Sequence, residues 1–309
     1  MRKQVLSPDS KLGKYSHRLL VSYDGTDYYG WQLQDHFPTV QGAMESALSM
    51  VTREDRVVLG VCGAGRTDSG VHAAGQVVQF YTNTEPDTST LAHRLNSLLS
   101  DDVRVHAAWR TAPDFSVTCT ALTKTYHYHM HTTRIHNPFT LRYRHHQRQA
   151  LDVGVMRRAA ACMVGVHDFT QFSNQNDQRL KRNPVKLLQR VDVVEAEDGL
   201  RVEVQGTGFL YKMVRHLTGV LIAVGEGVLP VETVTERLKV GNSTIPGGVG
   251  GLWRGYNIAP AKGLILHQVV YPASADDPST LLYPTQPHDS FGRLIGRLPG
   301  RPVEGDDDE

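Results

Sequence analysis

The sequence has 309 residues, 40% of them hydrophobic, and a formal net charge of +1, so it can bury the core of one large domain or of two ordinary ones. No stretch approaches the ~20 consecutive apolar residues of a membrane span, and the amino terminus lacks the apolar segment of a secretory signal, so we expect a cytoplasmic protein with no membrane partner. The three cysteines are odd in number and none has the CxxC spacing, so the sequence indicates neither a disulfide framework nor a structural zinc site.

The first half of the chain alternates predicted strands and helices. Apolar and alternating runs predict strands at residues 17–24, 56–62, 75–81 and 102–109. Apolar residues three and four apart predict one helix over PTVQGAMESALSMV, with Thr39 as its amino-terminal cap, and a second around 91–99. The glycine- and aromatic-rich stretch YDGTDYYGWQ, directly after the first strand, is predicted to be a loop.

A similar order of elements returns after residue 151. The patterns predict strands at 186–194, 199–206 and 263–271, a hairpin turn at EDGL, and helices around 155–163, 210–224 and 231–240. A glycine-rich loop is expected at 245–255, and the Pro, Ser, Gly and acid content of 273–309 predicts a disordered acidic tail. Helices and strands in this mixed order predict an α+β fold with a mostly antiparallel sheet and helices on one face.

One long segment is basic and aromatic. Residues 115–151 contain no Asp or Glu, and they interleave aromatic residues and six histidines with five cations, namely Lys124, Arg134, Arg142, Arg144 and Arg148. This composition suits RNA, because cations meet phosphates and flat rings stack on bases. A solvated basic face is the alternative interpretation.

The stretch GAGRTDSG, residues 63–70, is the strongest candidate for chemistry. It lacks the Lys-Ser or Lys-Thr of a phosphate loop and the x-x-G that opens the helix of a dinucleotide site, which excludes both. A lone carboxylate, Asp68, beside Arg66 suits nucleophilic or acid–base work at an electrophilic carbon, whereas a glycosidase would need a second carboxylate nearby. The alternative is that Asp68 only caps a turn through its own side chain.

Three histidines alternate along TYHYHMH. In a strand, His127, His129 and His131 share one face, and Tyr126 lies on the other. Three imidazoles in a row could bind zinc. No partner motif such as HExxH accompanies them, so we expect histidines that decorate a polar face and no metal site.

Several stretches together resemble one family. GAGRTDSGVHAAGQVV is similar to the catalytic motif of the TruA family of tRNA pseudouridine synthases, and so, in the family's order, are YDGTDYYGWQLQ, TVQGAMESAL, FSVTCTALTKTYHY, HDFTQF, GTGFLYKMVRHLTG and APAKGLILHQVVY. The resemblance covers about residues 18–272. It implies an enzyme that breaks the N1–C1′ bond of a uridine in RNA, turns the base and rejoins it through C5.

The resemblance also implies how the chain is divided. Two similar halves would form one continuous, mostly antiparallel sheet with an RNA-binding cleft across it. Residues 17–115 would be the catalytic half that carries the GRTD motif, and 116–272 the half that completes the cleft. Residues 1–16 would be a flexible basic segment, for which an organellar transit peptide is the alternative, although it has no clear amphipathic repeat.

The same resemblance assigns four site residues. Asp68 is the catalytic carboxylate, and Arg215, in YKMVRH, pairs with it and holds its oxygen in line. Tyr126 stacks on the target base, and Arg66 enters the helical stack and helps to evict the nucleotide. Without the resemblance, Arg215 is an exposed cation on a helix and Tyr126 a half-buried strand aromatic. Three routes are open for Asp68: attack on C1′, addition to the ring, or removal of a 2′ proton to give a glycal.

The expected partner is tRNA. The resemblance implies uridines 38–40 of the anticodon stem-loop as targets and a homodimer as the assembly. No redox cofactor, acyl carrier or metal is required, because one bond is broken and another made within the same nucleotide. Two alternatives belong to other classes: an RNA-binding assembly factor or chaperone, and a nucleoside hydrolase that uses the same aspartate. A pure binder gains little from a carboxylate facing phosphate, and no feature suggests the water route that a hydrolase needs.

Overall fold

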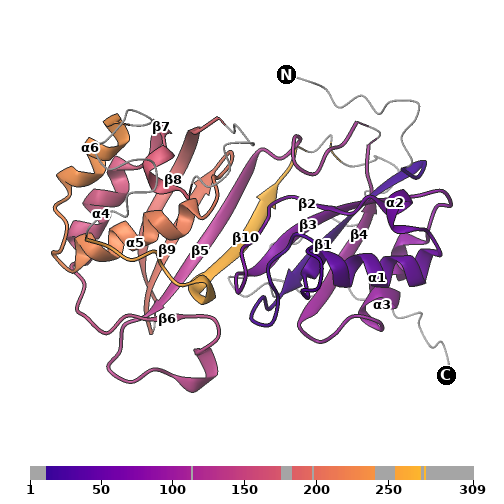
Figure 1. Ribbon diagram of the computed structural model, residues 1–309, viewed down its shortest axis with the longest axis horizontal. Coiled ribbons are helices and arrows are strands. Elements are labelled where there is room, and N and C mark those ends of the chain that lie inside the picture. The colour runs from indigo at the N-terminus through magenta and orange to yellow at the C-terminus, as the bar shows by residue number, and fades with distance from the viewer. Residues whose placement is uncertain are drawn as a thin grey trace, which may run out of the picture.

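One sheet runs through the part of the chain that the computed structural model describes, which is residues 12–112, 114–174, 183–196, 198–240, 255–272 and 275 (Figure 1). Its ten strands are β1 (Tyr15–Tyr23), β2 (Cys62–Gly63), β3 (His72–Thr82), β4 (Val103–Arg110), β5 (Thr123–His131), β6 (His145–His146), β7 (Gly165–Asp168), β8 (Val185–Ala196), β9 (Gly199–Gly206) and β10 (Leu264–Val270). The α-helices in these residues are α1 (Val40–Thr52), α2 (Arg56–Leu59), α3 (Thr88–Asn96), α4 (Val153–Cys162), α5 (Met213–Gly225) and α6 (Glu232–Val240). Short 3₁₀ turns lie at Pro138–Thr140, Thr170–Phe172 and Ala261–Gly263.

The last strand of the described chain joins the two halves of the sheet at its centre. The order is β4-β1-β3-β10-β5-β9-β8-β7, with β2 beside β3 and β6 beside β5. Strand β10 lies between β3, to which it is parallel, and β5, to which it is antiparallel. The β5·β6 pair is also parallel, and the other pairs among the described strands are antiparallel. The predicted α+β fold with a mostly antiparallel sheet is therefore confirmed.

The helices lie on one side of this sheet. In Figure 1, α1 and α3 lie in front of the strands of the amino-terminal half, and α4 and α5 lie in front of β8 and β9. The sheet contributes apolar side chains to the core from residues paired on neighbouring strands, such as Leu19 with Val78 and Tyr128 with Val202. All four of these side chains are fully buried, and burial of each stabilises the fold by roughly 1.5–3 kcal/mol. The sheet is thus rigid where it carries the loops that follow.

Helix α1 forms as its sequence predicts. The hydroxyl of Thr39 accepts a hydrogen bond from the backbone nitrogen of Gly42, which satisfies one of the free amides of the first turn. Met44 and Leu48 lie on the buried face. The helix ends at Arg53, which adopts a left-handed conformation and donates its backbone N–H to Ser49.

The prediction of a strand at residues 56–62 is wrong. Residues Arg56–Leu59 form α2, the left-handed Gly60 ends that helix, and only Cys62 and Gly63 pair with β3. In the antiparallel register that pairs Cys62 with Gln79, residues before 59 lie beyond Thr82, where β3 ends, so a strand over the whole of 56–62 has no neighbour to pair with. The helix instead buries Leu59 completely. Tertiary packing has overridden the β-propensity of the two valines.

Other predicted elements are confirmed with shifted ends. Strand β9 has the predicted bounds, β3 begins three residues early, and α5 begins at Met213 because Lys212 before it is left-handed. Strand β1 begins at Tyr15, two residues before the expected start of the catalytic half. The glycine-rich loop at 245–254 and the tail, apart from 275, lie outside the described residues. No helix of the described ranges is long and apolar enough to span a membrane.

Candidate active site

The turn that contains Asp68 lies between β2 and β3, beside the point where β10 joins the two halves of the sheet. Its carboxylate Oδ2 lies 3.2 Å from Nη1 of Arg215, a residue 147 positions later in the chain. The two side chains are only 17% and 13% exposed. Partial burial strengthens such an ion pair relative to one on the surface, because less water screens the charges. The structure thus joins the carboxylate and the arginine that the resemblance paired.

Arg215 is held from its other side by the chain that leads to β10. Its Nε donates a 2.7 Å hydrogen bond to the carbonyl oxygen of Ala259, and its own carbonyl oxygen accepts from the Ala259 amide at 3.1 Å. The guanidinium is therefore fixed at both ends in the first turn of α5. A planar group with donors in two directions can satisfy both partners at once.

Tyr126 also reaches this turn. Its side chain on β5 is buried, and its hydroxyl lies 3.2 Å from the point where Gly65 would carry a Cβ. Its ring meets the ring of Phe209 edge to face at 5.0 Å. Burial raises the pKa of Tyr126, and the charges of Tyr23 and Asp68 raise it further. Asp68, Arg215 and Tyr126 thus come from three separate elements and meet at one place.

Arg66 is the exposed member of the predicted site. It lies on the outer side of the same turn, two residues before Asp68. No described residue forms a hydrogen bond or ion pair with its side chain, so within the described chain the guanidinium is available to a bound molecule. This position fits the role that the resemblance implies.

A buried glutamine that the sequence analysis did not single out holds the turn in place. Gln76 on β3 has no exposed surface, and its side-chain amide binds the Gly65 backbone twice: Nε2 donates to the carbonyl oxygen at 2.6 Å, and Oε1 accepts from the amide at 3.2 Å. Tyr23 adds a 2.7 Å hydrogen bond to Thr67. The signal was present in GQVVQF, because a polar side chain inside an apolar strand must find a buried partner.

The loop after β1 packs against the same turn through Gly30. This residue has a φ of +91°, and a Cβ on it would lie 2.6 Å from the carbonyl oxygen of Thr67. Only glycine permits both this backbone angle and this approach. The glycine-rich loop YDGTDYYGWQ therefore serves to support the GRTD turn.

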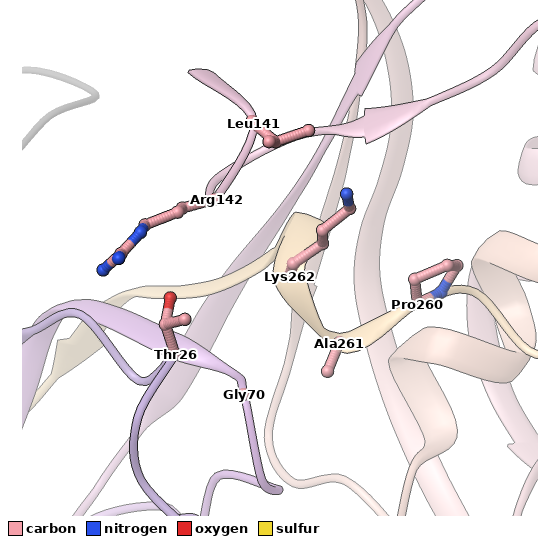
Figure 2. Close-up of a pocket in the computed structure, with 7 residues that line it drawn as sticks. All are labelled: Thr26, Gly70, Leu141, Arg142, Pro260, Ala261 and Lys262. Carbon is pink, nitrogen blue, oxygen red and sulfur yellow. The ribbon is translucent and has the colours of Figure 1, made fainter. Parts of the chain in front are cut away.

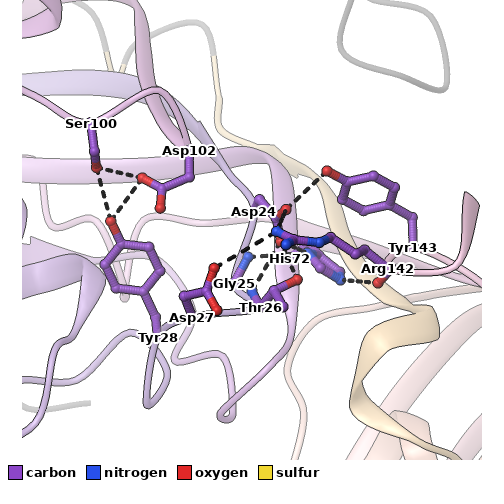
Figure 3. Close-up of polar contacts among 10 residues, drawn as sticks. All are labelled: Asp24, Gly25, Thr26, Asp27, Tyr28, His72, Ser100, Asp102, Arg142 and Tyr143. Carbon is purple, nitrogen blue, oxygen red and sulfur yellow. Dashed lines mark hydrogen bonds and ion pairs between the residues drawn. The ribbon is translucent and has the colours of Figure 1, made fainter. Parts of the chain in front are cut away.

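His72, at the end of the same motif, belongs to a second polar cluster (Figure 3). Its Nδ1 lies 3.0 Å from Oδ1 of Asp24, and its Nε2 donates to the carbonyl oxygen of Arg142 at 3.1 Å. The hydroxyl of Tyr143 donates to Oδ2 of Asp24 at 2.9 Å. Burial alone would raise the pKa of Asp24, but hydrogen bonds from His72, Thr26 and Tyr143 bring it well below its usual range. The cluster ties the segment around Arg142 to the strand that follows the Asp68 turn.

The cations of the basic segment do not form one solvated face. Lys124 donates to the carbonyl oxygen of Ala64 at 2.6 Å, on the turn itself. Arg144 is 16% exposed and lies 3.2 Å from Asp198. Arg142, by contrast, is 60% exposed. Of these three cations, Arg142 is the one that presents most of its side chain to solvent.

The three histidines on β5 share one face, as predicted, but they are buried rather than set on an open polar surface. The ring of His127 stacks on His267 at 3.9 Å, and its Nε2 lies 4.0 Å from Glu203. Burial lowers the pKa of His127 to about 2 and that of His129 to about 4. Among the described residues no group of three or more His, Cys, Asp or Glu is arranged to hold a metal ion.

Comparisons with known proteins agree on one family. A family model described as tRNA pseudouridine synthase matches residues 19–119 and 159–272. The tRNA pseudouridine synthase A 1 of Protochlamydia amoebophila is 37% identical over 83% of this chain and 96% of its own length. The tRNA pseudouridine synthase A of Bacillus pumilus is 37% identical over 81% and 97%. A solved Cbf5-Nop10-Gar1 complex covers 67% of this chain and 45% of its own at 13% identity, with a TM-score of 0.30, which is too low to indicate a shared fold.

Proposed function

This chain belongs to the tRNA pseudouridine synthase family and is an isomerase that converts uridine to pseudouridine in tRNA, and we propose that Asp68 is the carboxylate that performs the reaction. The observation that carries this proposal is the 3.2 Å ion pair between Asp68 and Arg215 in a partly buried site. An arginine at this distance binds a carboxylate through a charge-assisted hydrogen bond, which is stronger than a bond between neutral groups. It also holds one oxygen in a fixed direction, which leaves the other free to meet the nucleotide.

The reaction exchanges one glycosidic bond for another. The N1–C1′ bond of uridine breaks, the base turns, the C5–C1′ bond forms, and the proton on C5 is lost while N1 gains one. Asp68 attacks C1′, adds to the ring or removes a 2′ proton, and each of these three routes requires an ionised carboxylate close to the flipped nucleotide. No atom leaves the nucleotide, apart from protons exchanged with solvent.

Tyr126 and Arg66 bind the nucleotide in this proposal. Tyr126 provides the aromatic surface for the uracil base beside Asp68, and its contact with Phe209 fixes the orientation of its ring. Arg66 is exposed and enters the helical stack of the RNA, where it replaces part of the stacking that the flipped base has lost. Extrusion costs a few kcal/mol, so a cation that fills the gap lowers the cost.

The preferred substrate, the assembly and the location follow from the family resemblance. We place the target among uridines 38–40 of the anticodon stem-loop, whose flexible arm lowers the cost of extrusion, and we place the enzyme in the cytoplasm. We propose a homodimer, for which the supporting feature is a pair of exposed apolar side chains on the loop at 132–144. On this loop Ile135 and Phe139 are 81% and 91% exposed, and a second copy could cover such side chains. Sedimentation equilibrium measures the assembly directly.

The test of the catalytic proposal compares Asp68→Asn with the wild-type protein on unmodified tRNA, with pseudouridine mapped by chemical sequencing. We expect wild-type protein to modify the anticodon arm and the variant to bind tRNA but form no pseudouridine. Asp101→Asn is the matched control, because this carboxylate is fully exposed and lies at the start of β4. If both proteins bound tRNA and neither modified it, the RNA-binding assembly factor would be the better interpretation.

A further inference from the structure

A pocket of about 360 Å³ adjoins the catalytic turn and has no role in the site described so far (Figure 2). Its lining includes Thr26, Gly70, Leu141, Arg142, Ala261 and Lys262. These residues come from the loop after β1, the catalytic turn, the segment before β6 and the turn before β10. The pocket therefore lies where both halves of the sheet meet.

The pocket borders both members of the Asp68–Arg215 pair through their neighbours in the chain. Gly70 is two residues after Asp68, and Ala261 is two residues after Ala259, whose carbonyl oxygen binds Arg215. A Cβ on Gly70 would lie 3.4 Å from the Cβ of Ala261, so these two walls are in contact. A nucleotide that reached Asp68 would have an adjoining part of its strand at this pocket.

Lys262 supplies a positive charge that no described carboxylate compensates. Its side chain is half-buried, and none of the described residues forms a hydrogen bond or ion pair with it. Its charge acts instead on histidines: after burial, it is the largest cause of the lowered pKa of His145. A half-buried lysine among neutral imidazoles attracts an anion more strongly than a solvated one, because water screens it less.

Arg142 supplies a second cation, whose guanidinium makes long ion pairs while its backbone is fixed by a hydrogen bond. Its Nη1 lies 3.8 Å from Asp24 and 3.7 Å from Asp27, which are long ion pairs, and the side chain is 60% exposed. Its carbonyl oxygen accepts from His72, and Tyr143 beside it is bound to Asp24. The backbone position is thus fixed while the guanidinium is free to exchange its weak contacts for a stronger one.

From this arrangement we infer that the pocket binds a phosphodiester group of the substrate RNA, next to the nucleotide at Asp68, with Lys262 and Arg142 as its cations. The remaining lining residues have no aromatic ring to stack on a base and no side-chain amide to read its edge; they are Thr26, Gly70, Leu141, Pro260 and Ala261. Two cations in a pocket whose other lining residues are uncharged suit a compact anion. The inference rests on the proposed function, because it assumes that the RNA strand at the pocket is the one whose uridine reacts at Asp68.

The first experiment measures the salt dependence of tRNA binding and the rate of pseudouridine formation for Lys262→Gln and Arg142→Gln. We expect each variant to lower the log–log salt slope by about one unit. Loss of one charge-assisted contact should raise KM by about tenfold or more, with a smaller effect on kcat. Lys239→Gln, an exposed lysine near the end of α6, is the matched control and should behave as wild type. Equal slopes for Lys262→Gln and Lys239→Gln would overturn the inference.

The second experiment identifies the phosphate. Anticodon-arm RNAs carry one neutral methylphosphonate linkage, placed either 5′ or 3′ to the target uridine. If Lys262 contacts one of these linkages, the neutral linkage weakens wild-type binding but has little further effect on Lys262→Gln. Inorganic phosphate that competes with RNA in wild-type protein, with no dependence on either linkage, would show a free-anion site and refute the RNA subsite.

The wild-type rate in the same assay distinguishes a failure of the proposed function from a failure of the phosphate subsite. A wild-type protein that forms no pseudouridine in any tRNA contradicts the proposed function itself. A wild-type protein that forms it normally, alongside a Lys262→Gln variant with unchanged KM and salt slope, contradicts only the phosphate subsite. Thermal melting of each variant checks that its fold is intact.

Discussion

Replacement of Arg215 by methionine is the sharpest test of the charge pair at the centre of this site. The guanidinium makes two contacts at once, from Nη1 to Asp68 at 3.2 Å and from Nε to the Ala259 carbonyl oxygen at 2.7 Å. Methionine fills a similar volume but offers neither donor. The carboxylate of Asp68 would then be left in a partly buried site without a cation and without a fixed direction.

The size of the effect follows from the contacts. A hydrogen bond to a charged group contributes about 1.5–3 kcal/mol, and each 1.36 kcal/mol in the activation free energy is a factor of ten in rate. We therefore expect Arg215→Met to slow the chemical step by roughly 10- to 150-fold. The rate of Arg215→Lys should fall between the rates of the wild-type protein and Arg215→Met, because one ammonium nitrogen cannot replace both Nη1 and Nε as donors in two directions.

The assay is single-turnover conversion of uridine to pseudouridine with enzyme in excess over tRNA, which isolates chemistry from product release. Filter binding gives the tRNA affinity, which should change little. Arg158→Met, an exposed arginine on α4, is the control for loss of a cation of the same size. If Arg215→Met retained a rate within threefold of wild type while folding normally, the pair would not be part of the catalytic machinery.

Two predictions concern the stability of the fold and the turn. Burial, and then the charge of Arg110, lower the pKa of His17 from 6.5 to about 4, so the unfolded chain binds a proton that the folded protein does not as pH falls from 6.5 to 4. The free energy of unfolding should therefore decrease by about 2 kcal/mol between pH 7 and pH 5 on account of this residue. Urea titrations at the two pH values should show that His17→Gln loses this part of the decrease. If the decrease were the same in His17→Gln as in the wild-type protein, the assignment would be contradicted. Gln76→Leu should leave the amide and carbonyl of Gly65 without their side-chain partners, which lowers both the melting temperature and the turnover rate. Calorimetry and the tRNA assay measure these two quantities. Wild-type values for both would refute the prediction.

Much of the secondary structure could be predicted because it depends on local periodicity. Alternation located β9 to the residue, and the three-and-four spacing after Thr39 located α1 with its cap. The short apolar run at 56–62 failed for the reason that such runs often do: period and composition are the same for a buried strand and a short buried helix. The end of β3 at Thr82 decided between them, because in the register of β2 it leaves residues before 59 with no strand to pair with.

The sequence by itself determined that Asp68 sits in a glycine-rich turn with Arg66, and its resemblance to a family supplied Arg215 and Tyr126. On local pattern alone Arg215 was an exposed cation on a helix. Tertiary structure decided otherwise, because β10 lies between β3 and β5, and Arg215 of α5 binds both Ala259, in the segment before β10, and Asp68 in the turn.

The surroundings of Gln76, His72 and Lys262 were likewise decided only by the fold. Each depends on a partner or a pocket wall from another segment: Gln76 on the turn that precedes β3, His72 on Asp24 and Arg142, and Lys262 on a space enclosed by four separate loops. A sequence pattern records which groups a short segment carries. Which groups from distant segments they meet is set by how the strands are ordered, and that order is a property of the whole chain.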